Sequence, residues 1–296
     1  MPTILKGKQI KRVGIITKRN NDSFVPVIKK LSKYLKKKKV EILFDNNSSE
    51  YFKTEEGHKK EKILKKADLI ITLGGDGTLL KTARRISLKK VMVLGVNLGN
   101  LGFLTETTPD KLTETLDKIF EGKYAIDKRS LLRVTIYRGG QKIETFLALN
   151  DAVINQGAFA RLIKIDLEAD GRKVVNFMAD GMIIATPTGS TAHALSAGGP
   201  IVHPYLHAFV IAPICPSSLS MRPIVIPDDK QITAVIATQR RDESAIIGLT
   251  IDGQDMMILK YGDKIRFRRS QRSLYLVRTQ NRYYRVLRSK LNWGEL

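Results

Sequence analysis

The sequence predicts an α/β domain followed by a domain made mainly of β-strands. Up to residue 122, short apolar runs alternate with segments of helical apolar spacing, which is typical of a doubly wound, mostly parallel sheet. Beyond it, apolar runs follow one another with few helical patterns, and Gly139-Gly140 and Asp170-Gly171 are hairpin signals. We therefore expect an α/β domain at 1–122, a β-rich domain at 123–275, and a tail at 276–296 that could pack back on the first domain.

The elements of the first domain follow from local patterns. Its strands are short apolar runs, at 13–17, 40–44, 69–73 and 91–96. Its helices have apolar residues at helical spacing, basic residues near their ends, or a Pro-Asp start, at 24–35, 59–66, 78–86 and 109–120. The polar segment 45–57 is expected to be a loop.

The second domain is predicted from β-rich runs alone. The expected strands lie at 132–137, 142–149, 162–168, 173–178, 182–186, 232–237, 245–251 and 264–268. The tail carries Tyr283, Tyr284, Val286 and Leu287 as residues that could pack.

Composition limits the classes of protein. The chain has 51 Lys+Arg against 29 Asp+Glu, a formal net charge of +22, so polyanions are expected to be attracted to it. Nucleic acid, an acidic membrane or a phosphorylated small molecule would each fit this charge. The single cysteine, Cys215, excludes an intrachain disulfide and suits a reducing compartment. Neither the apolar core of a signal peptide nor a membrane span is visible, so we expect a cytoplasmic protein without a membrane partner.

The segment Gly74-Gly75-Asp76-Gly77-Thr78 follows a buried strand and precedes a helix. Glycines let a backbone or phosphate group come close, and the first N–H groups of the helix suit an anion. Asp76 adds a carboxylate that can take a proton. This combination predicts a phosphoryl-transfer site, although the segment alone is equally compatible with an ordinary turn in which Asp76 caps the helix.

Two further segments have chemical potential. Asn150-Asp151 ends an apolar run and offers a donor and acceptors to ribose hydroxyls or an amide, although a plain turn is the alternative. Residues 181–221 contain no Asp, Glu, Lys or Arg. This stretch could form a pocket wall, in which Ser190 or Thr191 caps a helix facing a ligand, or a packing interface of small residues.

Other common motifs are absent from the sequence. No P-loop or Gly-x-Ser-x-Gly segment occurs, and Cys215 with His203 and His207 matches no common zinc spacing. We therefore expect no metal site built by the chain itself.

Taken together, these segments resemble the ATP-NAD kinase family, which makes NADP. Four blocks stand in the family's order, at 74–78, 97–104, 150–151 and 180–200. The first is shared with lipid kinases and, more loosely, phosphofructokinases, whereas the last is far more specific. The resemblance implies ATP-dependent phosphorylation of the adenosine-ribose 2′-hydroxyl of NAD, with Mg²⁺ accompanying ATP and polyphosphate as another donor. It also implies a homodimer or homotetramer.

The resemblance assigns roles residue by residue. Asp76 matches the general base for the 2′-hydroxyl, and Lys81 could steady phosphate charge. Asp180 matches a position near the nicotinamide end, which a neighbouring subunit could present. The other positions implied to bind NAD or ATP are Gly74, Gly75, Gly77, Thr78, Asn150, Asp151, Arg161, Met178, Thr188, Thr191, Ala192, His193, Ala194, Leu195, Ser196 and Gln254.

Three of these positions depart from the common family pattern. Asp151 stands where many members have Glu, His193 where many have Tyr, and Met178 where Arg is frequent. The departures bear on affinity and substrate preference rather than on the class of reaction.

Two alternative functions were weighed. A lipid or sugar kinase would share only the glycine turn, and the block at 180–200 opposes it. A nucleic-acid-binding protein would explain the charge of +22, but the basic residues lie in scattered patches without interleaved aromatic residues. We therefore expect small-molecule partners, NAD and ATP, and no nucleic acid.

Overall fold

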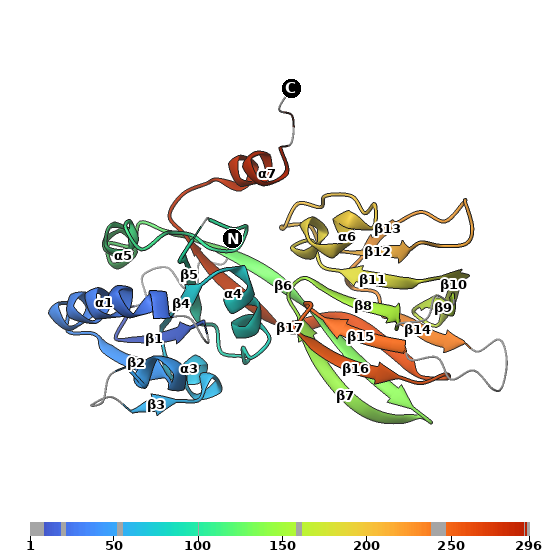
Figure 1. Cartoon of the computed structure of the whole chain (residues 1–296), viewed down its shortest axis with the longest axis horizontal. Helices are drawn as coiled ribbons and strands as arrows, with labels where there is room; N and C mark the ends of the chain where they lie inside the picture. The colour runs from blue at the N-terminus through green and yellow to red at the C-terminus, as the bar shows by residue number, and fades with distance from the viewer. Residues whose placement is uncertain are drawn as a thin grey trace. The chain divides into compact units, whose positions relative to one another are not determined.

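The computed structural model describes residues 9–18, 22–51, 56–99, 101–157, 162–237, 247–292 and 294. The chain divides into two compact units (Figure 1). Unit 1 is Met1–Lys128 with Ser273–Leu296, and unit 2 is Arg129–Arg272.

Unit 1 is built on a parallel sheet with the strand order β17-β5-β4-β1-β2-β3. Its strands are β1 (Arg12–Thr17), β2 (Glu41–Asp45), β3 (Gly57–His58), β4 (Leu69–Gly74), β5 (Met92–Asn97) and the end of β17 (Lys264–Arg278). Pairing of β5 with β17 joins Met92 to Tyr275, so the last strand of the chain lies beside β5.

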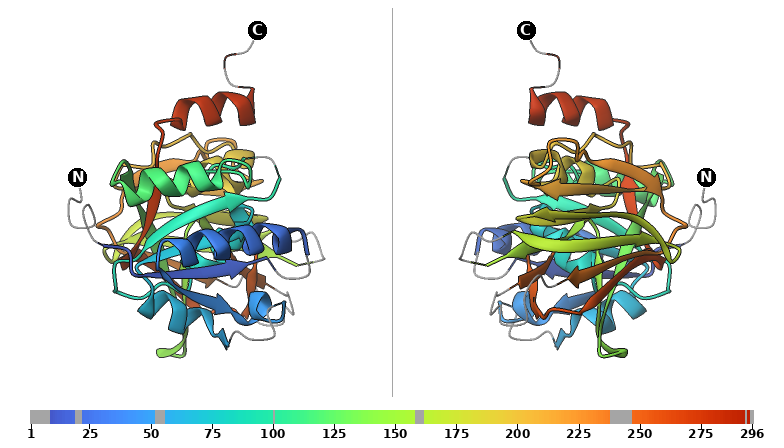
Figure 2. Two further views of the ribbon diagram at one scale, coloured as in Figure 1. Left: turned by 90° about the vertical axis from the view of Figure 1, so that its left-hand side faces the viewer. Right: turned by 90° about the vertical axis from the view of Figure 1, so that its right-hand side faces the viewer.

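Helices cover both faces of this sheet (Figures 1 and 2). The helices are α1 (Val25–Lys37), α2 (Asn46–Ser49), α3 (Lys60–Lys66), α4 (Asp76–Ala83), α5 (Leu112–Phe120) and α7 (Tyr283–Leu291), with a 3₁₀ turn, η2 (Asp22–Phe24). α1 and α5 share one core with alternate residues of β1, β4 and β5. On the other face, a Cβ at Gly14 would lie 2.2 Å from Ile63 of α3, and one at Gly95 would lie 2.8 Å from Leu79 of α4. The predicted doubly wound α/β architecture is confirmed.

Besides β17 up to Arg272, which pairs antiparallel with β14, the described residues of unit 2 form further antiparallel strands. They are β6 (Ala125–Arg138), which starts in unit 1, and β7 (Gln141–Ala148), β8 (Asp151–Gln156), β9 (Ile163–Ala169), β10 (Arg172–Ala179), β11 (Gly181–Ala185), β12 (Ala208–Ile214), β13 (Ile224–Pro227), β14 (Ile232–Ala237), β15 (Ile247–Ile251) and β16 (Asp255–Leu259). One sheet has the order β13-β12-β11-β8-β15-β16, and the other includes β10-β9-β14-β17. A single core takes apolar residues from both sheets, as in a β-sandwich. Two short turns, η3 (Gly189–Thr191) and α6 (His193–Ser196), follow β11.

Some predicted element boundaries were wrong. The segment expected to be a loop at 45–57 contains α2 and β3, because the Asp45 carboxylate accepts the Ser48 N–H at 3.0 Å and caps the short helix. The helix after the glycine turn is Asp76–Ala83 rather than 78–86. The strands β8, β12, β13 and β16 were not predicted.

The structure explains in part why residues 181–221 contain no charged side chain. β11 and β12 pair with each other inside it and are almost entirely buried. Burial therefore accounts for the missing charges on these strands, whereas the segments between and after them include exposed residues.

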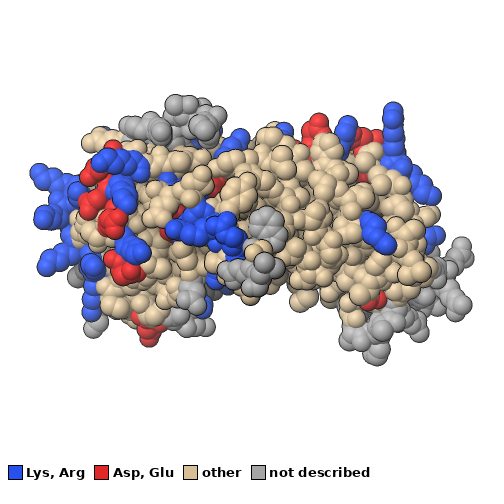
Figure 3. Space-filling model, turned by 90° about the horizontal axis from the view of Figure 1, so that it is seen from above, with Lys and Arg blue, Asp and Glu red and all other residues tan. Residues whose placement is uncertain are grey.

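The basic residues do not form one continuous patch on the face shown in Figure 3, where Lys and Arg lie in separate groups with Asp and Glu among them. Among the described residues, no helix is both long and apolar enough to cross a membrane.

Candidate functional site

The glycine turn joins β4 to α4 in unit 1. β4 ends at Gly74, Gly75 has an extended backbone with φ −123°, and α4 begins at Asp76. A Cβ at residue 74 would lie 2.2 Å from Thr78 Oγ1, so glycine is required there by close packing rather than by a positive φ. Thr78 is buried, whereas Gly77 and, further along α4, Lys81 are exposed.

Asp76 is held by backbone N–H groups from another segment. Phe103 N–H donates to Oδ2 at 2.9 Å, and the N–H groups of Leu104 and Thr105 donate to Oδ1 at 3.3 and 3.2 Å. Gly102 lies against the same carboxylate, since a Cβ there would be 2.3 Å from Oδ1. The carboxylate is therefore fixed in orientation, yet Asp76 remains partly exposed.

Residues 97–99 and 101–105 form the other wall of this turn. Leu98 N–H donates to the Gly74 carbonyl at 2.9 Å, and the Asn97 carboxamide accepts the Gly99 N–H at 2.9 Å. Thr105 Oγ1 accepts the Gly102 N–H at 2.9 Å. The block at 97–104 thus has a local role, namely to fold a turn whose amides meet Asp76.

In unit 2, the Asn150-Asp151 pair lies between the end of β7 at Ala148 and the start of β8 at Asp151. Its backbone is fixed by Asp252, whose carboxylate accepts the N–H groups of Leu149, Asn150 and Asp151 at 3.0, 2.8 and 3.2 Å. The Asp151 carbonyl in turn accepts the Asp252 N–H at 3.0 Å. Sequence reasoning did not select Asp252, although it follows a strand directly and precedes Gly253.

Asp151 is electrostatically unusual. The residue is only 4% exposed. Burial, followed by the neighbouring charge of Asp252, raises its pKa from 3.8 to about 7, while the backbone N–H of His193 acts in the opposite direction. Its carboxyl group therefore exchanges a proton near neutral pH and can act as a hydrogen-bond donor or acceptor.

The segment 186–193 packs on the same pair. The Thr186 N–H donates to the Asn150 carbonyl at 2.8 Å, and a Cβ at Gly189 would lie 2.1 Å from that oxygen. The Thr188 hydroxyl accepts a hydrogen bond from Arg129 Nη1 at 3.2 Å. Asn150 and Asp151 are thereby brought together with Thr188 and the turn that leads to His193.

Ser190 does not cap a helix, which corrects the sequence expectation. α6 begins after Ala192 without a side-chain cap. The buried Ser190 hydroxyl instead lies 2.7 Å from the Pro187 carbonyl and accepts the Val202 N–H at 2.9 Å, so it joins the two ends of the turn. Thr191, Ala192, His193, Leu195 and Ser196 are partly or fully exposed, whereas Ala194 is buried.

Asp180 and Met178 lie apart from this group. Asp180 precedes β11, and the register pairs Gly181 with Asn155 but Ala185 with Asp151. Asp180 therefore lies about 15 Å along the strand from Asp151. Met178, on β10, is likewise at that far end, where its carbonyl accepts the Ser217 N–H at 2.9 Å. Gln254 follows Asp252 in the turn after β15, and Arg161 lies outside the described residues.

No group of three or more His, Cys, Asp or Glu residues that could hold a metal ion occurs among the described residues. The carboxylates of Asp76 and Asp252 accept hydrogen bonds from backbone N–H groups, and the carboxyl group of Asp151 is buried.

Comparisons with known proteins agree with this architecture. Residues 13–124 match the family model of the ATP-NAD kinase N-terminal domain, and residues 149–279 match that of the ATP-NAD kinase C-terminal domain. The chain is 42% identical to the NAD kinase of Geotalea daltonii over 97% of this chain and 100% of the relative. It is 40% identical to that of Geobacter sulfurreducens over the same shares.

Two solved structures are also similar. Yeast NADH kinase complexed with NADH gives a TM-score of 0.89 at 26% identity, covering 98% of this chain and 90% of the other. An NAD kinase from Archaeoglobus fulgidus in complex with ATP gives a TM-score of 0.71 at 27% identity, covering 95% and 98%. The chain therefore belongs to the ATP-NAD kinase family, phosphotransferases that convert NAD to NADP.

Proposed function

We propose that this chain transfers the γ-phosphoryl group of ATP to the 2′-hydroxyl of the adenosine ribose of NAD, with Asp76 as general base. The ribose oxygen forms the new bond to phosphorus, the bond from that phosphorus to the ADP oxygen breaks, and the hydroxyl proton passes to Asp76. The observation that carries the proposal is the partly exposed Asp76 carboxylate, fixed at the start of α4 by three N–H groups.

The hydrogen bonds of Asp76 also favour one oxygen as the proton acceptor. A carboxylate has about four acceptor positions in its plane. Among the described residues, backbone N–H groups occupy two positions on Oδ1 and one on Oδ2. We propose that the remaining position, on Oδ2, receives the ribose hydroxyl.

The residues of unit 2 are proposed to bind NAD. Asn150 and Asp151 would contact ribose hydroxyls, for which the proton exchange of Asp151 near neutral pH is suited. The exposed parts of the turn 188–196 would contact the adenine, with His193 replacing the more frequent Tyr. Gln254 and Arg161 would add NAD contacts. Asp180 and Met178, which lie at the far end of β11 and β10, would meet the nicotinamide end only if a neighbouring subunit presents them, so we propose a homodimer or homotetramer.

Magnesium is proposed to enter as the complex with ATP rather than through a site formed by the chain alone. Mg²⁺ usually keeps several waters and binds through phosphates with one or two carboxylates. Gly74, Gly75, Gly77 and Thr78 would approach the donor phosphates, and Lys81 would offset their charge when they are bound.

NADH is a second candidate acceptor, favoured by the TM-score of 0.89 with yeast NADH kinase complexed with NADH. The test supplies NAD and NADH in turn with ATP–Mg²⁺ or polyphosphate, and measures the phosphorylated dinucleotide. An NADP-specific dehydrogenase identifies the 2′ position of the new phosphate. The proposal predicts product from NAD with ATP. A protein that binds NAD but gives no 2′-phosphorylated product with either donor would refute it.

A further inference from the structure

The turn that holds Asp76 is itself held from its other side by an arginine near the C-terminus. Arg278 Nη1 donates to the Leu104 carbonyl at 3.1 Å and to the Thr105 carbonyl at 3.4 Å, and Nη2 donates to the Phe103 carbonyl at 3.3 Å. The same three residues, 103–105, donate their N–H groups to Asp76. Three consecutive residues therefore lie between one carboxylate and one guanidinium.

Two of these peptide units are shared by both hydrogen bonds. The Phe103 carbonyl and the Leu104 N–H belong to one peptide group, and the Leu104 carbonyl and the Thr105 N–H belong to the next. A cation at the carbonyl oxygen polarises the peptide and strengthens the hydrogen bond that its N–H donates. Arg278 is placed to act on Asp76 in this way without touching it.

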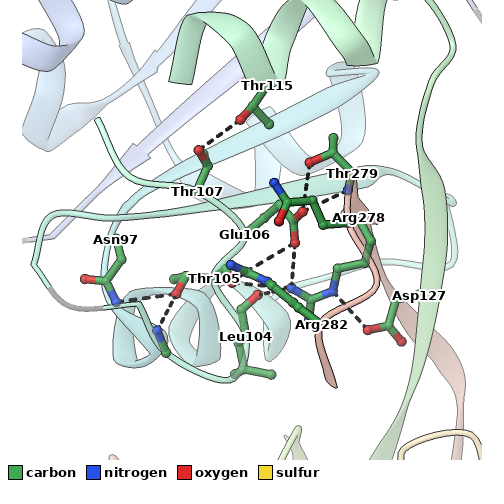
Figure 4. Close-up of polar contacts among 12 residues, drawn as sticks. Asn97, Leu104, Thr105, Glu106, Thr107, Thr115, Asp127, Arg278, Thr279 and Arg282 are labelled. Atoms are coloured by element: carbon green, nitrogen blue, oxygen red, sulfur yellow. Dashed lines mark hydrogen bonds and ion pairs between the residues drawn. The ribbon is translucent and has the colours of Figure 1, made fainter. Parts of the chain in front are cut away.

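Arg278 is itself fixed by buried acidic residues (Figure 4). Its Nη1 lies 3.2 Å from Glu106 Oε2, and its Nε lies 3.1 Å from Asp127 Oδ2. The side chains of Arg278, Glu106 and Asp127 are 14%, 1% and 6% exposed, so water screens these ion pairs little. The guanidinium therefore has a defined orientation toward the turn.

Arg282 completes the support. Its Nη2 lies 3.2 Å from Glu106 Oε2 and also donates to the Thr105 carbonyl. The other oxygen of Glu106 accepts the N–H and the hydroxyl of Thr279 at 2.8 and 2.9 Å. The end of β17 and the segment leading to α7 thus hold the turn by charged side chains whose hydrogen bonds are satisfied.

We propose that Arg278 is a positioning residue for phosphoryl transfer, which orients and polarises the peptide groups of 103–105 so that they hold the Asp76 carboxylate in its reactive orientation. This inference rests on the proposed role of Asp76 as general base. It extends the functional machinery to the tail of the chain, more than 170 positions away in sequence.

The test is the Arg278→Lys variant, which keeps the positive charge but removes the planar fork that reaches three carbonyls. We expect kcat to fall about 10- to 100-fold, because small displacements of a catalytic group have effects of this size. The KM values for NAD and ATP should change less than about twofold, since Arg278 is not proposed to bind substrate. Arg285→Lys is the matched control, because Arg285 follows on α7 and donates to the Gln280 side chain.

A double-mutant cycle separates positioning from general stabilisation. In the Asp76→Asn background, Arg278→Lys should lower residual activity less than about twofold, because the carboxylate through which it acts is gone. A second full 10- to 100-fold loss there, or a wild-type kcat for folded Arg278→Lys, would overturn the inference. If Arg278→Lys does not fold, the Arg282→Lys variant is measured instead. A lower kcat at unchanged KM in that variant would support the inference, and an unchanged kcat would oppose it.

The Asp76→Asn variant alone distinguishes the two proposals. Full activity in that variant would remove the proposed base, and the inference with it. Loss of activity in Asp76→Asn together with a normal kcat in Arg278→Lys would remove the inference only.

Discussion

Replacing Asp151 by Asn should stabilise the ligand-free protein, and the gain should grow as the pH rises. Asp151 is 4% exposed, and burial together with the charge of Asp252 raises its pKa from 3.8 to about 7. Ionising this carboxyl group in the folded protein is therefore unfavourable. Asn has almost the same shape, carries no charge and can still accept the His193 N–H.

The sign and size follow from proton linkage. Because the folded pKa lies above the unfolded value, the stability contributed by the protonated Asp151 is fully present below pH 3.8 and is lost as the pH rises to about 7. The difference of about three units, at about 1.36 kcal/mol per unit, corresponds to about 4 kcal/mol. The variant should gain about 4 kcal/mol at pH 8 and about 2 kcal/mol at pH 5.

Urea unfolding of the ligand-free protein at these two pH values measures the effect. Asp229→Asn, an exposed aspartate of the same unit, is the control and should change the free energy of unfolding by less than about 0.5 kcal/mol at both pH values. A gain that is the same at pH 5 and pH 8, or a loss of stability at pH 8, would refute the electrostatic reasoning.

Three further substitutions test the packing of the site and the core. Gly102→Ala would place a Cβ 2.3 Å from Asp76 Oδ1, so kcat should fall about 10- to 100-fold, and a wild-type kcat would contradict the fixed carboxylate. Gly189→Ala would place a Cβ 2.1 Å from the Asn150 carbonyl oxygen. The free energy of unfolding should therefore fall by about 1–3 kcal/mol, and the KM for NAD should rise. An unchanged KM would oppose the proposed NAD contact. Ile154→Ala, in the fully buried core of unit 2, should lower the free energy of unfolding by about 2–5 kcal/mol in urea, and a change below about 1 kcal/mol would indicate a loosely packed core.

The fold class was predictable because its signals are local. The strands of unit 1 are continuous apolar runs, since helices bury both faces of the sheet, and such runs are visible without a structure. The order of hairpin signals likewise predicted the β-rich character of unit 2. Edge strands such as β13 and β16 were missed because they are only four and five residues long, and so short an apolar run does not by itself indicate a strand.

The candidate site was predictable only in part. The glycine turn and the Asn-Asp pair could be selected because each places polar residues directly after an apolar run. The partners that fix them could not, since Asp252 is about a hundred positions from Asn150, and Arg278 is 174 positions from Leu104. Nothing in the local sequence around a hydrogen-bonding side chain predicts its partner across such distances; the topology of the two sheets brings them together.

The substitution of Asp76 by Asn tests the central claim most directly. Wild-type protein and the Asp76→Asn variant are compared for NADP formation from NAD and ATP–Mg²⁺, after matched unfolding curves establish that both are folded. The Asn side chain has the size of Asp76 and keeps one oxygen that the N–H groups of Leu104 and Thr105 can hold, while its NH2 group faces the Phe103 N–H, and it cannot accept the hydroxyl proton. The proposal predicts that kcat falls about 10²- to 10⁴-fold while NAD still binds. A folded variant that makes NADP at the wild-type rate would contradict it.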